Sequence, residues 1–202
     1  MQEDPGGATP LTEEELEELI ADHLTTRRQL DAWEQANIVR AEDWAFGRSR
    51  FDVTTVEGLR ELHRRMFSDT WRWAGEFRRS DKNIGVPKEL IGQNLGMVCD
   101  DLRFWLDAET YELREAAARY HHRIVHVHPF PNGNGRHGRL AADVLLARQG
   151  QGRFDWLGGG SLDRMDPVRE RYIHALRAAD DGDYRPLFGY LVVGDERPEV
   201  RP

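Results

Sequence analysis

Residues 128–139 place several chemically active side chains within twelve positions, reading His-Pro-Phe-Pro-Asn-Gly-Asn-Gly-Arg-His-Gly-Arg. Glycines let a backbone approach a ligand closely, and a glycine-rich turn that runs into a helix presents free N–H groups to an anion. Arginine side chains add bidentate donors for phosphate oxygens. A histidine beside a bound phosphate can accept a proton from an incoming hydroxyl. The stretch therefore predicts a phosphate or nucleotide site with a built-in base.

Two better-known phosphate motifs do not match these residues. The Walker loop ends in Gly-Lys-Ser/Thr, and the dinucleotide fingerprint follows a β-strand. Here the glycines lie between two segments with helical periodicity, so the order is helix, loop, helix.

A run of histidines also leads into this stretch, namely His121, His122, His126 and His128. His122 and His126 have the i, i+4 spacing that places two metal ligands on one face of a helix. A zinc site needs a third ligand and usually a glutamate base, and the His-Glu-x-x-His arrangement is absent. We therefore expect this pair to lie on the helix surface or to support neighbouring residues rather than to bind zinc.

The chain has 202 residues, enough for one domain or one domain with an appendage. Its net charge of -8 argues against a general nucleic-acid binder. The single cysteine, Cys99, excludes an intrachain disulfide and is expected to be a buried apolar filler. No apolar run approaches the ~20 residues that span a bilayer, and no signal peptide is recognisable. We therefore expect no membrane partner and a cytoplasmic location.

Helices must position these residues, and apolar periodicity and capping residues predict their boundaries. Thr12 is expected to cap the first helix, with Glu15 as its capping-box partner. The expected helices cover approximately residues 12–24, 26–44, 55–67, 87–106, 113–127, 134–149, 167–179 and 184–193. Residues 1–10 and the tail from Gly194 are expected to be mobile, and residues 150–160 to form a loop.

The apolar faces of these helices predict the core. Trp33, Trp44 and Phe104 are expected to pack inward. His63, which has apolar neighbours, is expected to be a buried and hydrogen-bonded structural residue rather than a ligand.

Residues 77–86 are the one expected departure from helix. The helical period disappears there, and Asn83, Gly85 and Pro87 break regular structure. A short extended segment or hairpin would accept a peptide by strand addition, while an ordinary surface loop fits the local residues equally well. The predicted fold class is mainly α with one small β-hairpin.

Residues 128–139 resemble the signature of the Fic (Fido) family, HPFx(D/E)GNGRxxR, and match eleven of its twelve positions. The segment LHRRMFSDTWRWAGEFR, from Leu62 to Arg78, is similar to the family segment that reads H…LF…WAG.R. YIHALRAADDGDYRPLFGYL resembles the closing helices of the family, so the resemblance covers approximately residues 55–193. WEQANI and HPFPNGNGRH look closest to a bacterial branch called mobile mystery protein B.

The resemblance implies a Fic-type helical bundle with a small β-hairpin flap. His128 would be the general base that deprotonates a target hydroxyl, which attacks the α-phosphate of ATP and releases pyrophosphate. The other implied roles are an anion hole at Gly133, Asn134 and Gly135, phosphate contacts from Arg136 and Arg139, a core anchor at Phe130, and a target-clamping flap at Asn83, Ile84, Gly85 and Val86. The implied domains are an N-terminal helical segment at 1–54, a Fic (Fido) domain at 55–193 and a flexible tail at 194–202.

Position 132 departs from the family signature. Asn132 stands where the family has the Asp or Glu that binds Mg²⁺, and an amide oxygen ligates a hard cation without contributing charge. Mg²⁺ is therefore expected to bind weakly through Asn132, and AMP transfer to be weak or altered.

Residues 30–35 resemble in part the inhibitory motif of the family, (S/T)xxxE(G/N). Glu34 stands at the glutamate, but Leu30 replaces the Ser or Thr, and Gln35 the Gly or Asn. The resemblance implies that Glu34 pairs with Arg139 and inhibits the enzyme; the alternative is a helix glutamate that faces solvent.

The predicted function is a protein adenylyltransferase that moves AMP from ATP to a Ser, Thr or Tyr hydroxyl of a target protein, with Mg²⁺ as cofactor. Removal of AMP, in which Glu34 would position water, and phosphate transfer are alternatives on the same site. A non-catalytic nucleotide- or protein-binding module is a third alternative, against which His128 argues. A homodimer is one of the assembly states left open.

Overall fold

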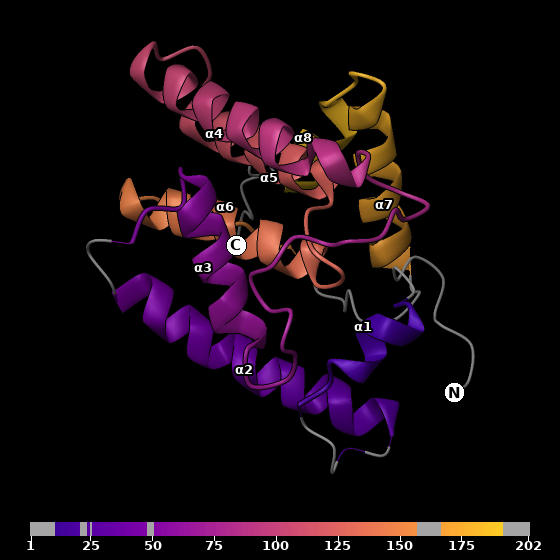
Figure 1. Ribbon diagram of the computed structural model, residues 1–202. Coiled ribbons are helices and arrows are strands. Elements are labelled where there is room, and N and C mark those ends of the chain that lie inside the picture. Colours follow the sequence, from indigo (N-terminus) through magenta and orange to yellow (C-terminus); the bar gives the residue numbers. More distant parts are fainter. Residues whose placement is uncertain (1–10, 21–23, 25, 48–50, 157–166, 192–202) are drawn as a thin grey trace.

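Two helices, α5 (Leu113–Val127) and α6 (Asn134–Arg148), pack against each other at the centre of the fold and are joined by residues 128–133 (Figure 1). The structure is a computed structural model and describes residues 11–20, 24, 26–47, 51–156 and 167–191. The predicted mobile ends at 1–10 and from Gly194 lie outside the described residues, as does part of the predicted loop at 150–160.

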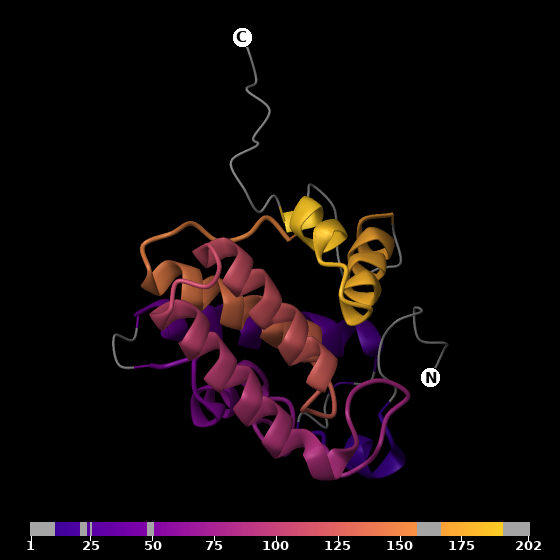
Figure 2. The ribbon, with the colours of Figure 1, turned by 90° about the horizontal axis from the view of Figure 1, so that it is seen from above.

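The other helices of the described part surround this central pair: α1 (Glu13–Glu17), α2 (Arg27–Gly47), α3 (Val56–Phe67), the short 3-10 helix η1 (Lys88–Leu90), α4 (Ile91–Asp107), α7 (Pro167–Asp180) and α8 (Arg185–Leu191). α4 packs on α5, whereas α2 and α3 pack on each other and against α6. α7 and α8 pack together beside α5, on one side of the domain (Figure 2). The prediction of a mainly α fold is confirmed, and no described helix has both the length and the apolar character needed to cross a membrane.

Capping side chains fix the starts of two helices, α1 and α3. Thr12 and Glu15 form the predicted capping box, with Thr12 N–H donating to Glu15 Oε2 at 2.8 Å. Thr55 caps α3 by accepting the Gly58 N–H at 3.0 Å.

Cys99 is buried, as the sequence predicted, and burial raises the pKa of its thiol to about 12.

Some predictions of helix length and of core residues are wrong, because tertiary contacts override the local sequence pattern. α1 ends at Glu17 instead of reaching residue 24, since Ile20 N–H donates to Thr70 O at 2.8 Å in an extended pairing. Trp33 is 38% exposed and Phe104 is 63% exposed, so neither belongs to the core. The apolar face of α4 is formed instead by residues one or two turns apart, namely Leu95, Val98 and Leu102.

The predicted β-hairpin at residues 77–86 is wrong: these described residues form a loop without a strand ladder. The main-chain N–H groups at the two ends of the loop bond to the chain around His128 instead of across the loop. Arg78 N–H donates to Pro129 O at 2.9 Å, and Val86 N–H donates to Val127 O at 3.4 Å. The loop is therefore attached along the chain that leaves α5.

Candidate active site

His128 lies at the point where α5 ends and the glycine-rich loop begins. Its backbone has the left-handed values φ 52° and ψ 59°, which turn the chain away from the axis of α5. The side chain is 5% exposed. Burial, together with the positive charges of Arg78 and Lys82, lowers the pKa of His128 to about 4, so the imidazole is neutral at pH 7 and able to accept a proton.

The side chain of Asn134 holds the loop in shape. Its Oδ1 accepts the Phe130 N–H at 2.9 Å, and its Nδ2 donates to Phe130 O at 2.8 Å. The Phe130 ring is fully buried and stacks on His63 with ring centroids 3.7 Å apart. Because the Asn134 amide holds the loop in this way, we expect Asn134 to contact a ligand through its main-chain N–H.

Gly133 immediately precedes α6 and has a conformation that only glycine tolerates well. Its φ is 79°, and an added Cβ would lie 2.5 Å from Phe67 Cζ. No side chain caps this end of α6, and the first N–H groups of a helix have no intrahelical acceptor. The positive end of the helix dipole adds to them, so residues 133–135 form a cradle suited to phosphate oxygens.

Glu34 pairs with Arg136 and not, as the sequence predicted, with Arg139. Its Oε2 accepts from Arg136 Nη1 at 2.7 Å, and its Oε1 accepts from Trp71 Nε1 at 2.7 Å. Glu34 is 5% exposed, so the alternative of a solvent-facing glutamate is also wrong. The Trp71 indole fixes the carboxylate beside the first turn of α6, where Arg136 is the arginine within reach.

Arg139, one turn further along α6, faces α7. Its guanidinium carbon lies 5.8 Å from the centre of the Tyr172 ring. Burial raises the pKa of Tyr172, and the positive charge of Arg139 opposes this shift. The two signature arginines therefore have separate surroundings, one against α2 and one against α7.

Asn132 offers little to a magnesium ion. Its Oδ1 already accepts the Gly133 N–H at 2.5 Å and lies 3.4 Å from Arg136 Nη2. The main-chain oxygen of Asn132 accepts from His63 Nε2 at 3.1 Å, and His63 Nδ1 accepts the Gly75 N–H at 2.9 Å. Mg²⁺ favours carboxylates, and here the amide carries no charge and has a cationic neighbour, so the described residues fit this ion poorly.

Arg78 is a site residue that the sequence prediction missed. Its buried guanidinium donates to three main-chain oxygens: His128 O at 2.7 Å, Ser80 O at 2.9 Å, and Val86 O. Arg78 therefore joins both ends of the 77–86 loop to the backbone of His128. The resemblance of WAGEFR to WAG.R marks this position in the sequence, but its role follows only from the three-dimensional contacts.

Of the predicted flap residues, Gly85 lies directly against His128. An added Cβ on Gly85 would lie 2.6 Å from His128 Cβ, and the φ of Gly85 is 91°. Ile84 is 48% exposed and Asn83 is exposed as well, whereas Val86 packs partly against the core. The loop therefore presents an open edge of main chain beside the catalytic candidate.

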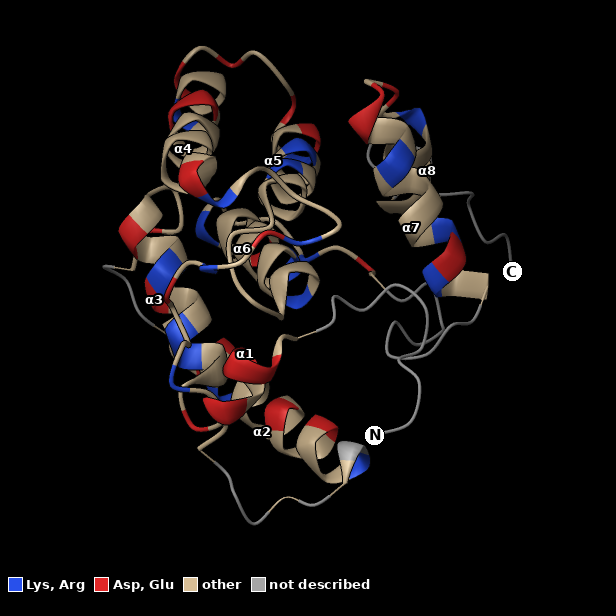
Figure 3. Cartoon of the chain, turned by 45° about the vertical axis from the view of Figure 1, so that its right-hand side comes forward, with Lys and Arg blue, Asp and Glu red and all other residues tan. Residues whose placement is uncertain are grey.

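The acidic helix α1, shown in red in Figure 3, is attached to the same loop. Glu15 accepts from Lys82 Nζ at 2.5 Å and from Ser80 Oγ at 2.9 Å. Burial raises the pKa of Glu15, but the hydrogen bonds from Lys82, Thr12 and Ser80 outweigh it, so the net pKa is lowered. A charged Glu15 thus ties the N-terminal segment to the loop.

Comparison of the sequence with known proteins shows which family it resembles. A family model described as Fic/DOC family matches residues 53–146. The chain is 31% identical over 150 residues to the protein adenylyltransferase Fic of Culex quinquefasciatus, an alignment that covers 72% of the chain and 28% of that protein. The chain thus spans little more than a quarter of the length of the curated relatives it matches.

Solved structures share the fold. The N-terminal FIC domain of the Bep8 protein from Bartonella sp. 1-1C has a TM-score of 0.67 at 14% identity, over 92% of this chain and 93% of that chain. The BepC protein of Bartonella tribocorum, solved with bound AMPPNP, has a TM-score of 0.65 at 17% identity, over 92% of this chain and 100% of that chain. At these identities the likeness establishes the fold, which is the Fic-type helical bundle that the sequence predicted.

Proposed function

The chain belongs to the Fic/DOC family, and on this premise we propose that it is a protein adenylyltransferase, which transfers AMP from ATP to a Ser, Thr or Tyr hydroxyl of a target protein. One observation carries the proposal: a buried, neutral His128 and the free N–H groups that begin α6 lie at the two ends of one short loop. A proton acceptor and an anion cradle are thereby held in fixed relation, as phosphoryl-group chemistry requires.

His128 acts as the general base. It takes the proton from the target hydroxyl while the hydroxyl oxygen attacks the α-phosphorus of ATP. The new oxygen–phosphorus bond forms as the bond to the bridging oxygen breaks, so pyrophosphate leaves and AMP remains on the target. Main-chain N–H groups of residues 133–135 stabilise the negative charge on the phosphate oxygens.

Arg136 and Arg139 supply the remaining phosphate contacts, since guanidinium groups bind phosphate oxygens in pairs. The nucleotide of the BepC structure supports ATP as the substrate. Gly133 N–H donates to Asn132 Oδ1, so a phosphate oxygen must displace this bond before it uses that donor.

Glu34 keeps the enzyme inhibited by holding Arg136. The carboxylate and the phosphates compete for one guanidinium, and Trp71 keeps the carboxylate in place at 2.7 Å. Release of Glu34 therefore frees Arg136 for the nucleotide.

Mg²⁺ is not assigned a step, because Asn132 provides no charge and its oxygen is engaged with Gly133. The weak binding of Mg²⁺ through Asn132 stays a prediction. The same holds for the domain boundaries at residues 54 and 193 and for a homodimer. The cytoplasmic location and the bacterial branch of the family also stay predictions. The 77–86 loop is proposed to bind the target segment through its exposed main chain next to Gly85.

Labelled ATP tests the function. Wild type, Glu34→Gly and Glu34→Gly/His128→Ala are incubated with ATP labelled at the α- or the γ-phosphate, and protein-bound label is counted. We expect α-label on Glu34→Gly, less on wild type and none on the double variant. Transfer of γ-label would indicate a phosphotransferase instead, and absence of both labels from all three proteins would indicate a non-catalytic module.

A further inference from the structure

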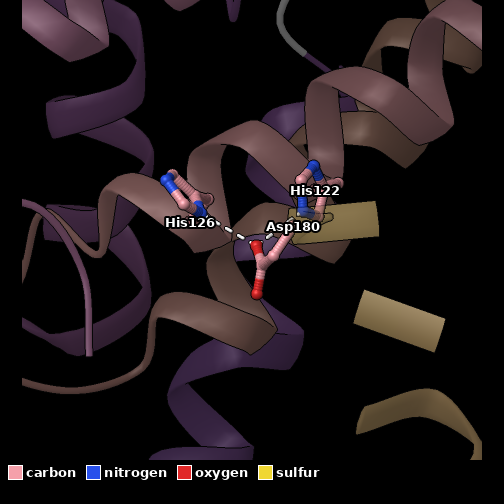
Figure 4. Close-up of side chains that lie close together, drawn as sticks. All are labelled: His122, His126 and Asp180. Atoms are coloured by element: carbon pink, nitrogen blue, oxygen red, sulfur yellow. Dashed lines mark hydrogen bonds and ion pairs between the residues drawn. The ribbon is translucent and has the colours of Figure 1, made fainter. Parts of the chain in front are cut away.

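A second cluster of ionisable side chains lies on the last turns of α5, away from the glycine-rich loop. His122 and His126 project from α5 toward Asp180, the last residue of α7 (Figure 4). Asp180 Oδ1 accepts from His122 Nε2 at 2.9 Å and from His126 Nδ1 at 2.8 Å. Among the described residues, this is the one group of three or more His, Cys, Asp or Glu side chains whose potential ligand atoms all lie within 4.8 Å of one another.

We propose that this cluster binds a divalent transition-metal ion of the Zn²⁺ type through His122 Nε2, His126 Nδ1 and Asp180 Oδ1. Two imidazoles and one carboxylate are a ligand set that Zn²⁺ accepts readily, with a fourth position left for water or another ligand. The sequence alone showed the histidine pair but gave no third ligand, because Asp180 is 54 residues from His126.

The distances suit an ion after a small movement. Zn²⁺ binds nitrogen and oxygen at about 2.0–2.2 Å, so the ligand atoms of a tetrahedral site lie roughly 3.3–3.5 Å apart. The nitrogen–oxygen distances of 2.8 and 2.9 Å are shorter, because Asp180 Oδ1 itself lies between the two imidazoles. Moving the exposed His126 and Asp180 outward by about half an ångström opens the position for the ion.

A neighbouring hydroxyl orients the least mobile ligand. Tyr184 Oη lies 2.9 Å from His122 Nδ1, and the His122 side chain is 6% exposed. A hydroxyl both donates and accepts hydrogen bonds, so its oxygen can accept a hydrogen bond from His122 Nδ1–H when Nε2 binds the metal. Outer partners of this kind set the tautomer and ring orientation of metal-bound histidines.

The ends of the two helices also favour a cation. The three ligands lie in the last turns of α5 and α7, where the main-chain carbonyls give each helix its negative end. Two arginines line the same pocket of about 460 Å³, but Arg119 pairs with Glu115 at 2.8 Å and Arg123 pairs with Asp101. The pocket gives the open coordination position access to solvent.

Metal titration tests the site on the full chain without an affinity tag or nucleotide. After chelator treatment, Zn²⁺ binding is measured by competition with a chromophoric chelator, and Co²⁺ is added separately to record its visible spectrum. We expect one equivalent of Zn²⁺ at micromolar or tighter affinity, and visible Co²⁺ bands typical of low coordination number. His126→Ala and Asp180→Asn should each weaken binding by about tenfold or more, whereas His174→Ala, an exposed histidine of α7, should not.

Thermal unfolding with and without Zn²⁺ provides a second readout, because an ion bound to the folded state raises the unfolding temperature. The rise should occur in wild type and His174→Ala and be lost in His126→Ala. Absence of Zn²⁺ binding in folded wild type would show that the cluster only links α5 to α7 through hydrogen bonds and ion pairs. Equal binding by His126→Ala and wild type would place the ion elsewhere; either result overturns the proposal.

Discussion

The carboxylate of Glu34 lies 2.7 Å from Nη1 of Arg136, across 102 positions of sequence. The same carboxylate is fixed by Trp71 Nε1, so both of its oxygens are used. This contact links helix α2 to the first turn of α6, where phosphate is proposed to bind. It makes Arg136, and not Arg139, the arginine through which the N-terminal segment acts on the site.

Replacing Glu34 by Gly is expected to raise AMP transfer. A hydrogen bond between charged groups contributes about 1.5–3 kcal/mol, so freeing Arg136 should increase labelling roughly 10–100-fold. The measurement is the initial rate of α-label incorporation at sub-saturating ATP. Glu42→Gln is the matched control, since it removes another α2 glutamate, paired with Arg153 at 3.3 Å away from the loop. Equal rates for Glu34→Gly and Glu42→Gln would show that the pairing does not inhibit.

Features that depend on neighbours in sequence could be predicted. The capping box of Thr12 and Glu15 spans three residues, and the loop from His128 lies between two strongly periodic helices. Such features follow from local hydrogen bonding and apolar spacing, which the sequence shows directly. The helical fold and the position of the candidate base at the end of a helix could therefore be predicted from the sequence.

Features that depend on distant partners could not be predicted. Nothing near Glu34 in sequence distinguishes Arg136 from Arg139, because the choice depends on where Trp71 places the carboxylate. The hairpin prediction failed for a similar reason, since the carbonyls that would bond across strands are instead taken by Arg78. In both cases a buried side chain determines the backbone and ion-pair geometry.

Replacing Arg78 by Lys is expected to slow transfer to a protein target without weakening nucleotide binding. A lysine keeps the charge but cannot reach the oxygens of His128, Ser80 and Val86 together, so the loop loses its fixed relation to the base. We expect about a tenfold or greater loss in target labelling, with the affinity for a fluorescent ATP analogue changed less than about twofold. The exposed Arg79→Lys is the control, and an equal loss of nucleotide affinity would contradict a positioning role for Arg78.

Replacing Asn132 by Asp tests the position where the chain departs from the family signature. A carboxylate would supply the charge that Mg²⁺ favours, although it would also attract Arg136, now 3.4 Å from Asn132 Oδ1. In the Glu34→Gly background, Asn132→Asp should increase labelling severalfold and make it rise more steeply with Mg²⁺ concentration. If Mg²⁺ titrations of the two proteins superimpose, the missing charge is not what limits activity.

Acid stability should change in a defined direction when Asp143 is replaced by Asn. Burial raises the pKa of Asp143 to about 6, although Trp156 Nε1 and the Phe154 N–H donate to it at 2.9 and 3.1 Å. The unfolded carboxyl ionises near pH 3.8, so between about pH 4 and 6 the folded state binds more protons, and Asp143 makes stability fall as pH rises. His137 acts in the opposite sense, because burial lowers its pKa to about 4.

Asp143→Asn removes one of these two opposing contributions. The free energy of unfolding of the variant should therefore drop more steeply than that of wild type as pH is lowered from 6 to 4, by about 2–3 kcal/mol in total. Urea unfolding at several pH values measures this slope, which is independent of any constant loss from the altered hydrogen bonds. Asp107→Asn, on the surface of α4, is the control. Parallel curves for Asp143→Asn and wild type would mean that Asp143 does not hold its proton through this range.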